Sequence, residues 1–244
     1  MESMGAARAI VQKADGPARF RARGREVIEG KARLIASNEV EVDVRRLRAK
    51  DVVIATGSRT AVPPVEGLSE TGFLDHVAFL AQDSLPKSIA ILGGGSIGIE
   101  FAQLFRRFGS DVTVVEMIDQ IIAREDAEVI TFIRNLLEQE GITIRTGWTV
   151  KSARRDGTQK VLAIETKNGE KDEVRADEIF VASGRRGNTE DLGLETVGMK
   201  MNRSYVSVDD YLGTSVPHLW ACGDVHGGLQ FAHVAAYEAV KRVR

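Results

Sequence analysis

Three glycines in the stretch AILGGGSIGIE, residues 90–100, have the spacing of a loop that can bind phosphate. Gly93, Gly95 and Gly98 form the pattern G-x-G-x-x-G directly after an apolar run. In such a loop the first glycine permits a tight turn, and the second lets a pyrophosphate approach the main chain. The third lets the following helix pack closely on the preceding strand. The pattern therefore predicts a cradle for a dinucleotide.

The flanking residues predict the elements that would hold this loop. Ile89, Ile91 and Leu92 favour a short buried strand. After the loop, apolar residues recur at helical spacing, and Gly109 predicts the end of that helix. These residues are Ile97, Phe101, Leu104, Phe105 and Phe108. The start of the helix would offer free N–H groups and the positive end of its dipole to a phosphate.

Glu116 ends a second predicted strand, residues 112–115. A carboxylate there accepts hydrogen bonds from a ribose 2′-OH and repels a 2′-phosphate, so NAD is favoured over NADP. Arg106, Arg107 and Arg124 are near in sequence and weaken this preference. The alternative is a glycine-rich turn before a core helix, with Glu116 merely solvated. Strand, helix, second strand and terminal acid together favour the nucleotide site.

Composition limits the classes of protein that need consideration. The 244 residues are 43% hydrophobic with a formal net charge of −2, which is typical of one large or two ordinary globular domains. No basic excess favours nucleic acid or an anionic membrane, and no apolar run is long enough to span a bilayer. No charged-then-apolar leader opens the chain, and a cytoplasmic location is expected by default.

The cysteine and the histidines predict no further chemistry. The one cysteine, Cys222, rules out a disulfide framework or a redox pair within the chain, and we interpret it as a small buried side chain. His76, His218 and His226 lack the spacing of metal ligands, so no metal site is predicted and solvated or turn positions are expected.

The chain contains an internal repeat. RAKDVVIATGSR, residues 48–59, matches RADEIFVASGRR, residues 175–186, so that Gly184 falls 127 positions after Gly57. Upstream, GREVIEGKARLI (24–35) resembles GITIRTGWTVKS (141–152). Turn signals occur within both copies, and each copy is predicted to be a strand meander that returns to a buried strand ending in glycine. The turn signals are Ser37-Asn38, Asp156-Gly157 and Asn168-Gly169.

The two copies differ at their beginnings. The glycine loop precedes Gly141 by 48 residues, and the same distance before Gly24 lies ahead of residue 1. We therefore expect that the first lobe never had a nucleotide loop or that the chain lacks the segment that held it. Residues 1–23 offer no strand–glycine–helix pattern, and Asp15-Gly16-Pro17 disfavours one continuous helix there.

A third apolar strand, HLWACGD (218–224), ends in Gly223 and Asp224. Ligands of open α/β sheets lie beyond the carboxyl ends of the strands. Gly57, Gly184 and Gly223 therefore mark places where a cofactor would approach the main chain. Asp224 could accept hydrogen bonds from a polyol or a ribose; its alternative is an Asx turn after the strand.

Several segments together resemble one family. ILGGGSIGIEFAQLFRRFGSDVTVVE, VVIATGSR, VASGRRGNTEDLGLE and TSVPHLWACGDV occur in the order and spacing of the class I pyridine nucleotide–disulfide oxidoreductases. The resemblance covers about residue 24 to the end, and GDVHGGLQFAHVAAYEA is closer to the mercuric reductase-like branch than to the dihydrolipoamide dehydrogenases. It implies an α/β, FAD/NAD(P)-binding (Rossmann-like) two-domain fold, with the NAD domain nested within an incomplete FAD domain.

The resemblance also implies domain limits and site residues. Residues 1–60 would be the middle of the FAD domain, 61–201 the NAD domain with linkers, and 202–244 the return of the FAD domain. NAD would contact Gly93, Gly94, Gly95, Ser96, Ile97, Gly98 and Glu100, with Glu116 at the adenosine ribose, Val150 at adenine and Gly184 near the nicotinamide half. FAD would contact Thr56, Gly57, Ser58, Asp224 at its ribityl chain, and Gln230, Phe231, Ala232 and His233 at the isoalloxazine. Without the resemblance, a histidine at position 233 more often packs in a core.

The family moves a hydride between NAD(P)H and flavin, passes electrons to a cysteine pair, and works as a homodimer. The sequence lacks the flavin glycine loop, the cysteine pair and the C-terminal interface domain with its His–Glu pair. No catalytic residue is therefore predicted. Glu100, which pairs with a lysine in the family, is expected to be exposed or to have a pKa raised by burial.

The leading hypothesis is a truncated flavin-dependent NAD oxidoreductase whose NAD domain folds, whose FAD binding is doubtful and whose activity alone is weak or nil. One alternative is a non-catalytic NAD-binding module or an inert fragment. Another is a flavin enzyme that reacts without cysteines, as diaphorases and NADH oxidases do.

Overall fold

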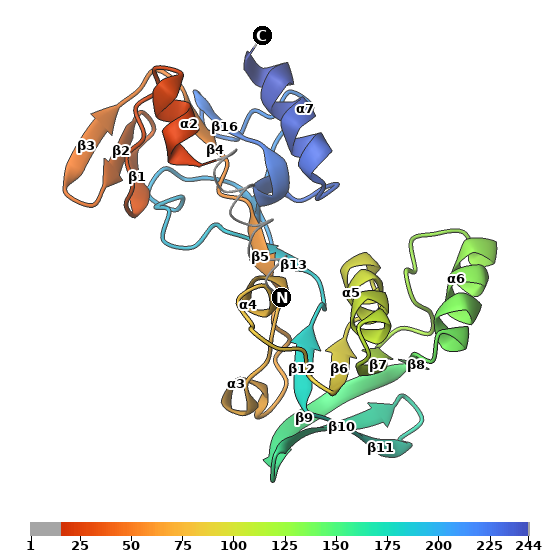
Figure 1. Cartoon of the computed structure of the whole chain (residues 1–244). Coiled ribbons are helices and arrows are strands. Elements are labelled where there is room, and N and C mark those ends of the chain that lie inside the picture. Colours follow the sequence, from red (N-terminus) through yellow and green to blue (C-terminus); the bar gives the residue numbers. More distant parts are fainter. Residues whose placement is uncertain (1–15, 244) are drawn as a thin grey trace. The chain divides into compact units, whose positions relative to one another are not determined.

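The computed structural model describes residues 16–243 (Figure 1). The chain divides into two compact units. Unit 1 is the continuous stretch Thr60–Gly184, and unit 2 combines the described residues before 60 with those after 184. Leu194 and Met199, which follow unit 1 in sequence, are buried in the core of unit 2. Between residues 16 and 243, no helix is both long and apolar enough to cross a bilayer.

A parallel sheet of four strands forms the centre of unit 1, in the order β12-β6-β7-β8. The strands are β6 (Ser88–Leu92), β7 (Asp111–Glu116), β8 (Thr143–Thr146) and β12 (Glu178–Val181). Parallel neighbours need crossover connections, and the chain supplies them as helices α5 (Ser96–Arg107) and α6 (Ala127–Gln139). The expected strand, helix and second strand around the glycine loop are thus confirmed.

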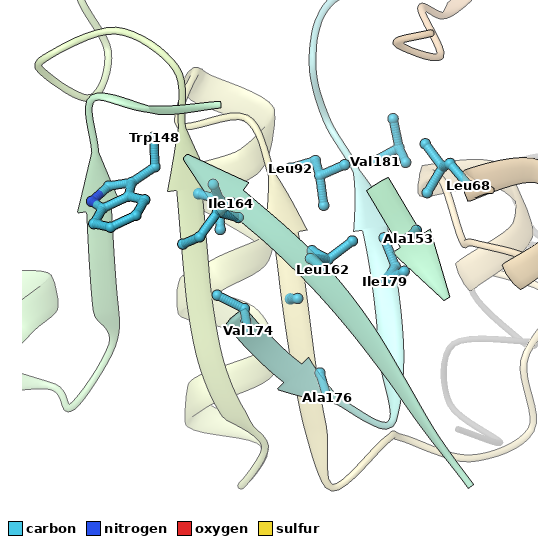
Figure 2. Close-up of a cluster of buried hydrophobic side chains, with 12 residues drawn as sticks. Leu68, Leu92, Trp148, Ala153, Leu162, Ile164, Val174, Ala176, Ile179 and Val181 are labelled. Carbon is cyan, nitrogen blue, oxygen red and sulfur yellow. The ribbon is translucent and has the colours of Figure 1, made fainter. Parts of the chain in front are cut away.

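An antiparallel sheet in the order β11-β10-β9 packs against one face of the parallel sheet (Figure 1). Its strands are β9 (Trp148–Asp156), β10 (Gln159–Thr166) and β11 (Lys171–Ala176), joined at the predicted Asp156-Gly157 and Asn168-Gly169 turns. Side chains from both sheets form one buried cluster (Figure 2). Its members are Leu68, Ala90, Leu92, Val115, Trp148, Ala153, Leu162, Ile164, Val174, Ala176, Ile179 and Val181.

Aromatic rings pack α5 onto the sheet. Phe101 lies 4.5 Å from Phe180 of β12 between ring centroids, and Phe105 lies 4.8 Å from Phe79 of the short helix α4 (His76–Phe79). Phe101 and Phe105, two of the apolar residues at helical spacing, therefore face the sheet. Phe108, the last of them, is 68% exposed, because the helix ends at Arg107 and the chain turns away at Gly109.

Unit 2 is built from small sheets around its own core. Strands β1 (Ala32–Ala36), β2 (Glu39–Val42) and β3 (Arg45–Arg48) form an antiparallel meander, and β4 (Val52–Ile54) pairs in parallel with β16 (Leu219–Ala221). The remaining elements are α2 (Pro17–Ala22), the β5 (Ser58–Thr60) and β13 (Arg185–Gly187) pair, the β14 (Met201–Asn202) and β15 (Tyr205–Val206) pair, the 3₁₀ helix η1 (Gly223–His226) and α7 (Ala232–Val243). The core comprises Leu34, Ile54, Leu194, Met199, Val206, Val216, Leu219, Ala221 and Val225.

The predicted internal repeat is present in the structure. In each copy a three-stranded antiparallel meander leads to a short strand of a parallel sheet, β4 in unit 2 and β12 in unit 1. The turn at Ser37-Asn38 joins β1 to β2 as expected. Gly57 and Gly184 follow the two strands with φ of 69° and 125°. The upstream similarity is only partial, since residues 141–147 include strand β8 whereas residues 24–30 form no strand.

A buried ion pair links strands β10 and β12 of unit 1. Lys160 of β10 is 5% exposed, and its Nζ contacts Glu178 Oε1 of β12. The same ammonium donates to the carbonyl of Gly72, 2.9 Å away, which ends the short helix α3 (Leu68–Thr71). One cation thus joins three segments that are distant in sequence.

We predict that Glu178→Leu lowers the free energy of unfolding of unit 1 by about 3 kcal/mol, because it leaves a buried ammonium without its counter-ion. Adding Lys160→Met should restore most of that loss. Urea unfolding followed by Trp148 fluorescence in a Trp220→Phe background would report on unit 1. The control is Glu165→Leu, which removes the partner of the more exposed Lys151 and should cost under about 1 kcal/mol. Equal losses in the two single variants would contradict the importance of the buried pair.

Candidate dinucleotide site

Two of the three motif glycines are required by the fold of unit 1. Gly93 has φ of +110°, and a Cβ there would collide with the carbonyl oxygen of Ala182. Gly98, on the first turn of α5, would place a Cβ against the carbonyl oxygen of Gly93. Both positions therefore need glycine because main chain approaches main chain.

The glycine at position 95 has no such explanation within the protein. It is the N-cap of α5 with φ of −73° and ψ of −179°, a conformation open to any residue. A Cβ at Gly95 would meet no described atom within 4 Å, and the residue is exposed. Absence of a side chain here leaves room for a group from outside the chain, which is the role of the second glycine in a pyrophosphate loop.

The N-terminus of α5 provides donors at the same place. The N–H groups of Ser96, Ile97 and Gly98 belong to the first turn, so they have no acceptor within the helix. Among the described residues, no side chain caps this end. Free N–H groups and the positive end of the helix dipole make it suited to an anion.

Glu116 lies directly against the loop. Its Oε2 accepts a hydrogen bond from the Gly94 N–H at 2.6 Å, and its Oε1 accepts one from the Ile118 N–H at 3.0 Å. The alternative of a merely solvated side chain is therefore wrong. An ionised carboxylate has about four acceptor positions, so capacity remains for the hydroxyl groups of a ribose.

The other residues predicted to contact NAD are less closely associated with the loop. Gly184 follows β12, next to β6, so it lies at the same edge of the sheet as Gly93. Val150 packs partly buried against the cluster between the sheets. Glu100 is exposed, which is the first of its two predicted outcomes. Whether these three contact NAD stays a prediction.

In unit 2, three of the residues predicted to contact flavin take part in two hydrogen-bonded groups. Ser58 Oγ donates to Asp224 Oδ2 at 2.6 Å, and Arg185 Nε donates to Ser58 Oγ at 2.6 Å. Thr56 Oγ1 donates to the carbonyl oxygen of Asn188 at 2.7 Å. The side chain of Asp224 is thus held by Ser58 and Arg185, and the alternative of an Asx turn is not supported.

Sequence reasoning did not single out Arg185 or Asn188. Both lie in the quoted segment VASGRRGNTEDLGLE, and Arg185 occupies the repeat position of Ser58. Arg185 Nε also lies 3.3 Å from Asp224 Oδ2, while the Asn188 amide donates to the carbonyl oxygen of Thr56 at 2.9 Å. Comparing the two copies position by position would have drawn attention to Arg185.

The last predicted segment, residues 230–233, leads into α7. Gln230 Nε2 donates to the Tyr205 hydroxyl at 3.3 Å, and that hydroxyl donates to the carbonyl oxygen of Arg185 at 2.6 Å. The Phe231 and His233 rings are exposed and stack 5.4 Å apart, so His233 is not a core residue. Ala232 begins the helix.

The cysteine behaves as predicted, but two histidines do not. His76 is half-buried in α4, with its Nδ1 3.3 Å from Thr60 Oγ1. Cys222 is buried, and burial, followed by the charge of Glu238, raises the pKa of its thiol. His226 was expected to be solvated or in a turn. It ends η1, but its side chain is largely buried with Nε2 3.0 Å from both Glu238 oxygens. Within the part of the chain that the structure describes, no cluster of side chains could hold a metal ion.

The chain as a whole is similar to known proteins. Residues 5–239 match the family described as pyridine nucleotide-disulphide oxidoreductase. The chain belongs to this family. It is 34% identical to mercuric reductase of Bacillus cereus over 216 residues, and 36% identical to dihydrolipoyl dehydrogenase of Acholeplasma laidlawii over 226 residues.

These matches cover 88% and 91% of the chain, but 34% and 65% of the two relatives. The chain therefore spans about a third to two thirds of the length of these curated relatives. The solved Cu(II) complex of the HOCl-induced flavoprotein disulfide reductase RclA from Escherichia coli is 32% identical with a TM-score of 0.81. That match covers 88% of the chain and 49% of RclA.

Near Thr56, one carboxylate is held between two guanidinium groups. Arg59 Nη2 donates to Glu190 Oε1 at 2.6 Å, and Arg186 Nη2 lies 2.7 Å from the same oxygen. The hydrogen bond from Arg59 is the main cause that lowers the pKa of Glu190 from 4.5 to about 2. The stability that this carboxylate contributes is complete above pH 4.5 and is lost as the pH falls towards 2.

We predict that a ¹³C NMR titration of the Glu190 carboxyl in the folded protein gives a midpoint of about 2. Arg59→Met should raise this midpoint most of the way towards 4.5, because it removes the largest cause of the shift. Arg186→Met, the matched control, should raise it less, since the charge of Arg186 is a smaller cause of the shift than the hydrogen bond from Arg59. An unaltered protein that titrates at about 4, the ordinary value, would contradict the prediction.

Proposed function

We propose that this chain binds NAD(H) at the glycine loop of unit 1. The observation that supports this most directly is Gly95, whose missing side chain serves no purpose within the protein. The N–H groups at the start of α5 would hold the pyrophosphate, and Glu116 would accept hydrogen bonds from the adenosine ribose. Family membership supports the same assignment.

We also propose that NAD(H) is preferred over NADP(H). Glu116 is fixed by two main-chain N–H groups, so its charge stays at the end of β7. A 2′-phosphate placed there would face a carboxylate, while a ribose diol would find acceptors. Arg124, on the segment that follows, is exposed to solvent.

The proposed role of unit 2 is to contact a flavin. When both cofactors are bound, the chemistry they supply is hydride exchange between nicotinamide and flavin. Ser58 and Arg185 would orient the Asp224 carboxylate towards the ribityl hydroxyls, and Thr56 and Gly57 would lie against the cofactor. Visible flavin absorbance of the purified chain, bleached by NADH, would support this role; a colourless chain that does not take up added FAD would contradict it.

A second candidate function is NAD binding without disulfide exchange by this chain. It is favoured by the single cysteine, which is buried and has a raised pKa. A thiolate is the reactive form, so this environment disfavours a nucleophile. Electrons therefore cannot pass to a cysteine pair within the 244 residues, and another acceptor would be needed.

A substitution at Gly95 separates NADH binding from folding. Gly95→Ala should change the free energy of unfolding by under about 1 kcal/mol, because its Cβ meets nothing in the protein and only the N-cap preference changes. It should weaken NADH binding by about tenfold or more, because the methyl group occupies the space of the pyrophosphate. Isothermal calorimetry with NADH and urea unfolding would measure both quantities.

Gly98→Ala is the contrasting variant, since its Cβ would strike the carbonyl oxygen of Gly93. It should cost about 1–3 kcal/mol of stability. If Gly95→Ala bound NADH as tightly as the unaltered chain, the phosphate would have to lie elsewhere. If the unaltered chain released no heat with NADH, the proposed function itself would be wrong.

A substitution at Glu116 tests the preference for NADH over NADPH. Glu116→Gln keeps an acceptor for the Gly94 N–H but removes the negative charge. We expect the ratio of NADPH to NADH dissociation constants to fall by about tenfold, because the 2′-phosphate is no longer repelled. Glu125→Gln removes an exposed carboxylate nearby and should leave the ratio unchanged. A ratio that is the same in all three proteins would exclude Glu116 as the source of specificity.

A further inference from the structure

The segment between β7 and α6, residues 117–126, contacts the glycine loop at Gly94; we call it the strap. Ile121 of the strap is fully buried, and its Cγ2 would lie 3.0 Å from a Cβ on Gly94. The next residue, Ile122, donates its N–H to the carbonyl oxygen of Gly94 at 2.8 Å. Since Glu116 accepts the Gly94 N–H, both main-chain polar groups of Gly94 have partners.

Ile122 makes this contact from an unfavourable backbone conformation. Its φ is +40°, in the left-handed region where a β-branched residue is a rare exception. Glycine or asparagine would adopt this conformation at much lower cost. Strained backbone of this kind persists only where the surrounding structure holds it, and it concentrates at binding sites.

The hydrogen bond of Ile122 fixes the orientation of one peptide group. The carbonyl of Gly94 and the N–H of Gly95 belong to the same trans peptide, so they point in opposite directions. With the carbonyl turned towards the strap, the Gly95 N–H is directed away from it. A reversed peptide would present an oxygen where a donor is needed and would repel phosphate.

We propose that Ile122 is a positioning residue for the dinucleotide. Its N–H holds the Gly94–Gly95 peptide in the orientation that offers the Gly95 N–H to the pyrophosphate. This inference rests on the proposed NAD(H) site, and it adds a residue of the strap that does not itself touch the ligand. The side chain of Ile122 is not needed for this role; its N–H is.

Two substitutions at the same position separate these contributions. Ile122→Gly removes the side chain, keeps the N–H and accepts positive φ without strain. Ile122→Pro also removes the side chain, but it lacks the N–H and restricts φ to negative values. We expect calorimetry to give an NADH dissociation constant within about twofold of the unaltered protein for the glycine variant, and about tenfold or more above it for the proline variant.

Amide NMR of the unaltered, ¹⁵N-labelled protein tests the same contact even if the proline variant does not fold. The Ile122 amide should be protected from hydrogen exchange before NADH is added, and the Gly95 amide should shift when NADH binds. Protection of the Ile122 amide tests the contact with Gly94, and the shift at Gly95 tests whether the same peptide offers its N–H to the ligand. An unprotected Ile122 amide would overturn the proposal, as would a Gly95 amide that stays unchanged while Ser96 shifts.

Failure of this inference is distinguishable from failure of the proposed function. Equal NADH affinity of the unaltered protein and a folded proline variant would overturn the role of Ile122 alone. Loss of binding in the glycine variant to the same extent as in the proline variant would overturn it too, by assigning the effect to the side chain. No NADH binding by the unaltered protein would overturn both.

Discussion

The close approach of helix α5 to strand β6 is the constraint on which the rest of the site depends. Gly98 faces the carbonyl of Gly93 with no room for a side chain, and Gly93 in turn lies against Ala182. Any Cβ at these positions would push the helix away from the sheet. Because the helix stays close, its first N–H groups lie at the carboxyl end of β6, beside the end of β7. The acid and the N-terminus of the helix are therefore neighbours for reasons of packing alone.

Sequence patterns predict the parts of this arrangement that are local. The run before Gly93, the spacing to Gly98 and the periodicity through Phe105 depend on residues only a few positions apart, and all were predicted correctly. The hairpins at Gly157 and Gly169 were predicted for the same reason. Short-range patterns determine elements because backbone geometry and side-chain periodicity act over a few residues.

Contacts between distant residues were not predictable in the same way. Nothing near Ser58 indicates that its hydroxyl meets Asp224 or Arg185, since these partners come from other elements. The burial of His226 depends on Glu238 of α7, and the end of unit 1 depends on where Leu194 packs. Position 122 is similar, because an isoleucine gives no sign of positive φ. The internal repeat is the one exception, as it relates Ser58 to Arg185 across 127 positions.

The two ends of unit 1 meet, since the N–H of Ala61 donates to the carbonyl oxygen of Gly184 at 2.9 Å. Because the first and last residues of unit 1 are adjacent, the two flanking segments of unit 2 need not be held apart. The insertion therefore adds little to the entropic cost of closing the chain. The host segments can fold around the junction as if a short turn stood there. Conversely, unit 1 is encoded by one continuous piece of gene, so it can be copied, exchanged or lost in evolution as a whole. Unit 2 is encoded by two separate pieces.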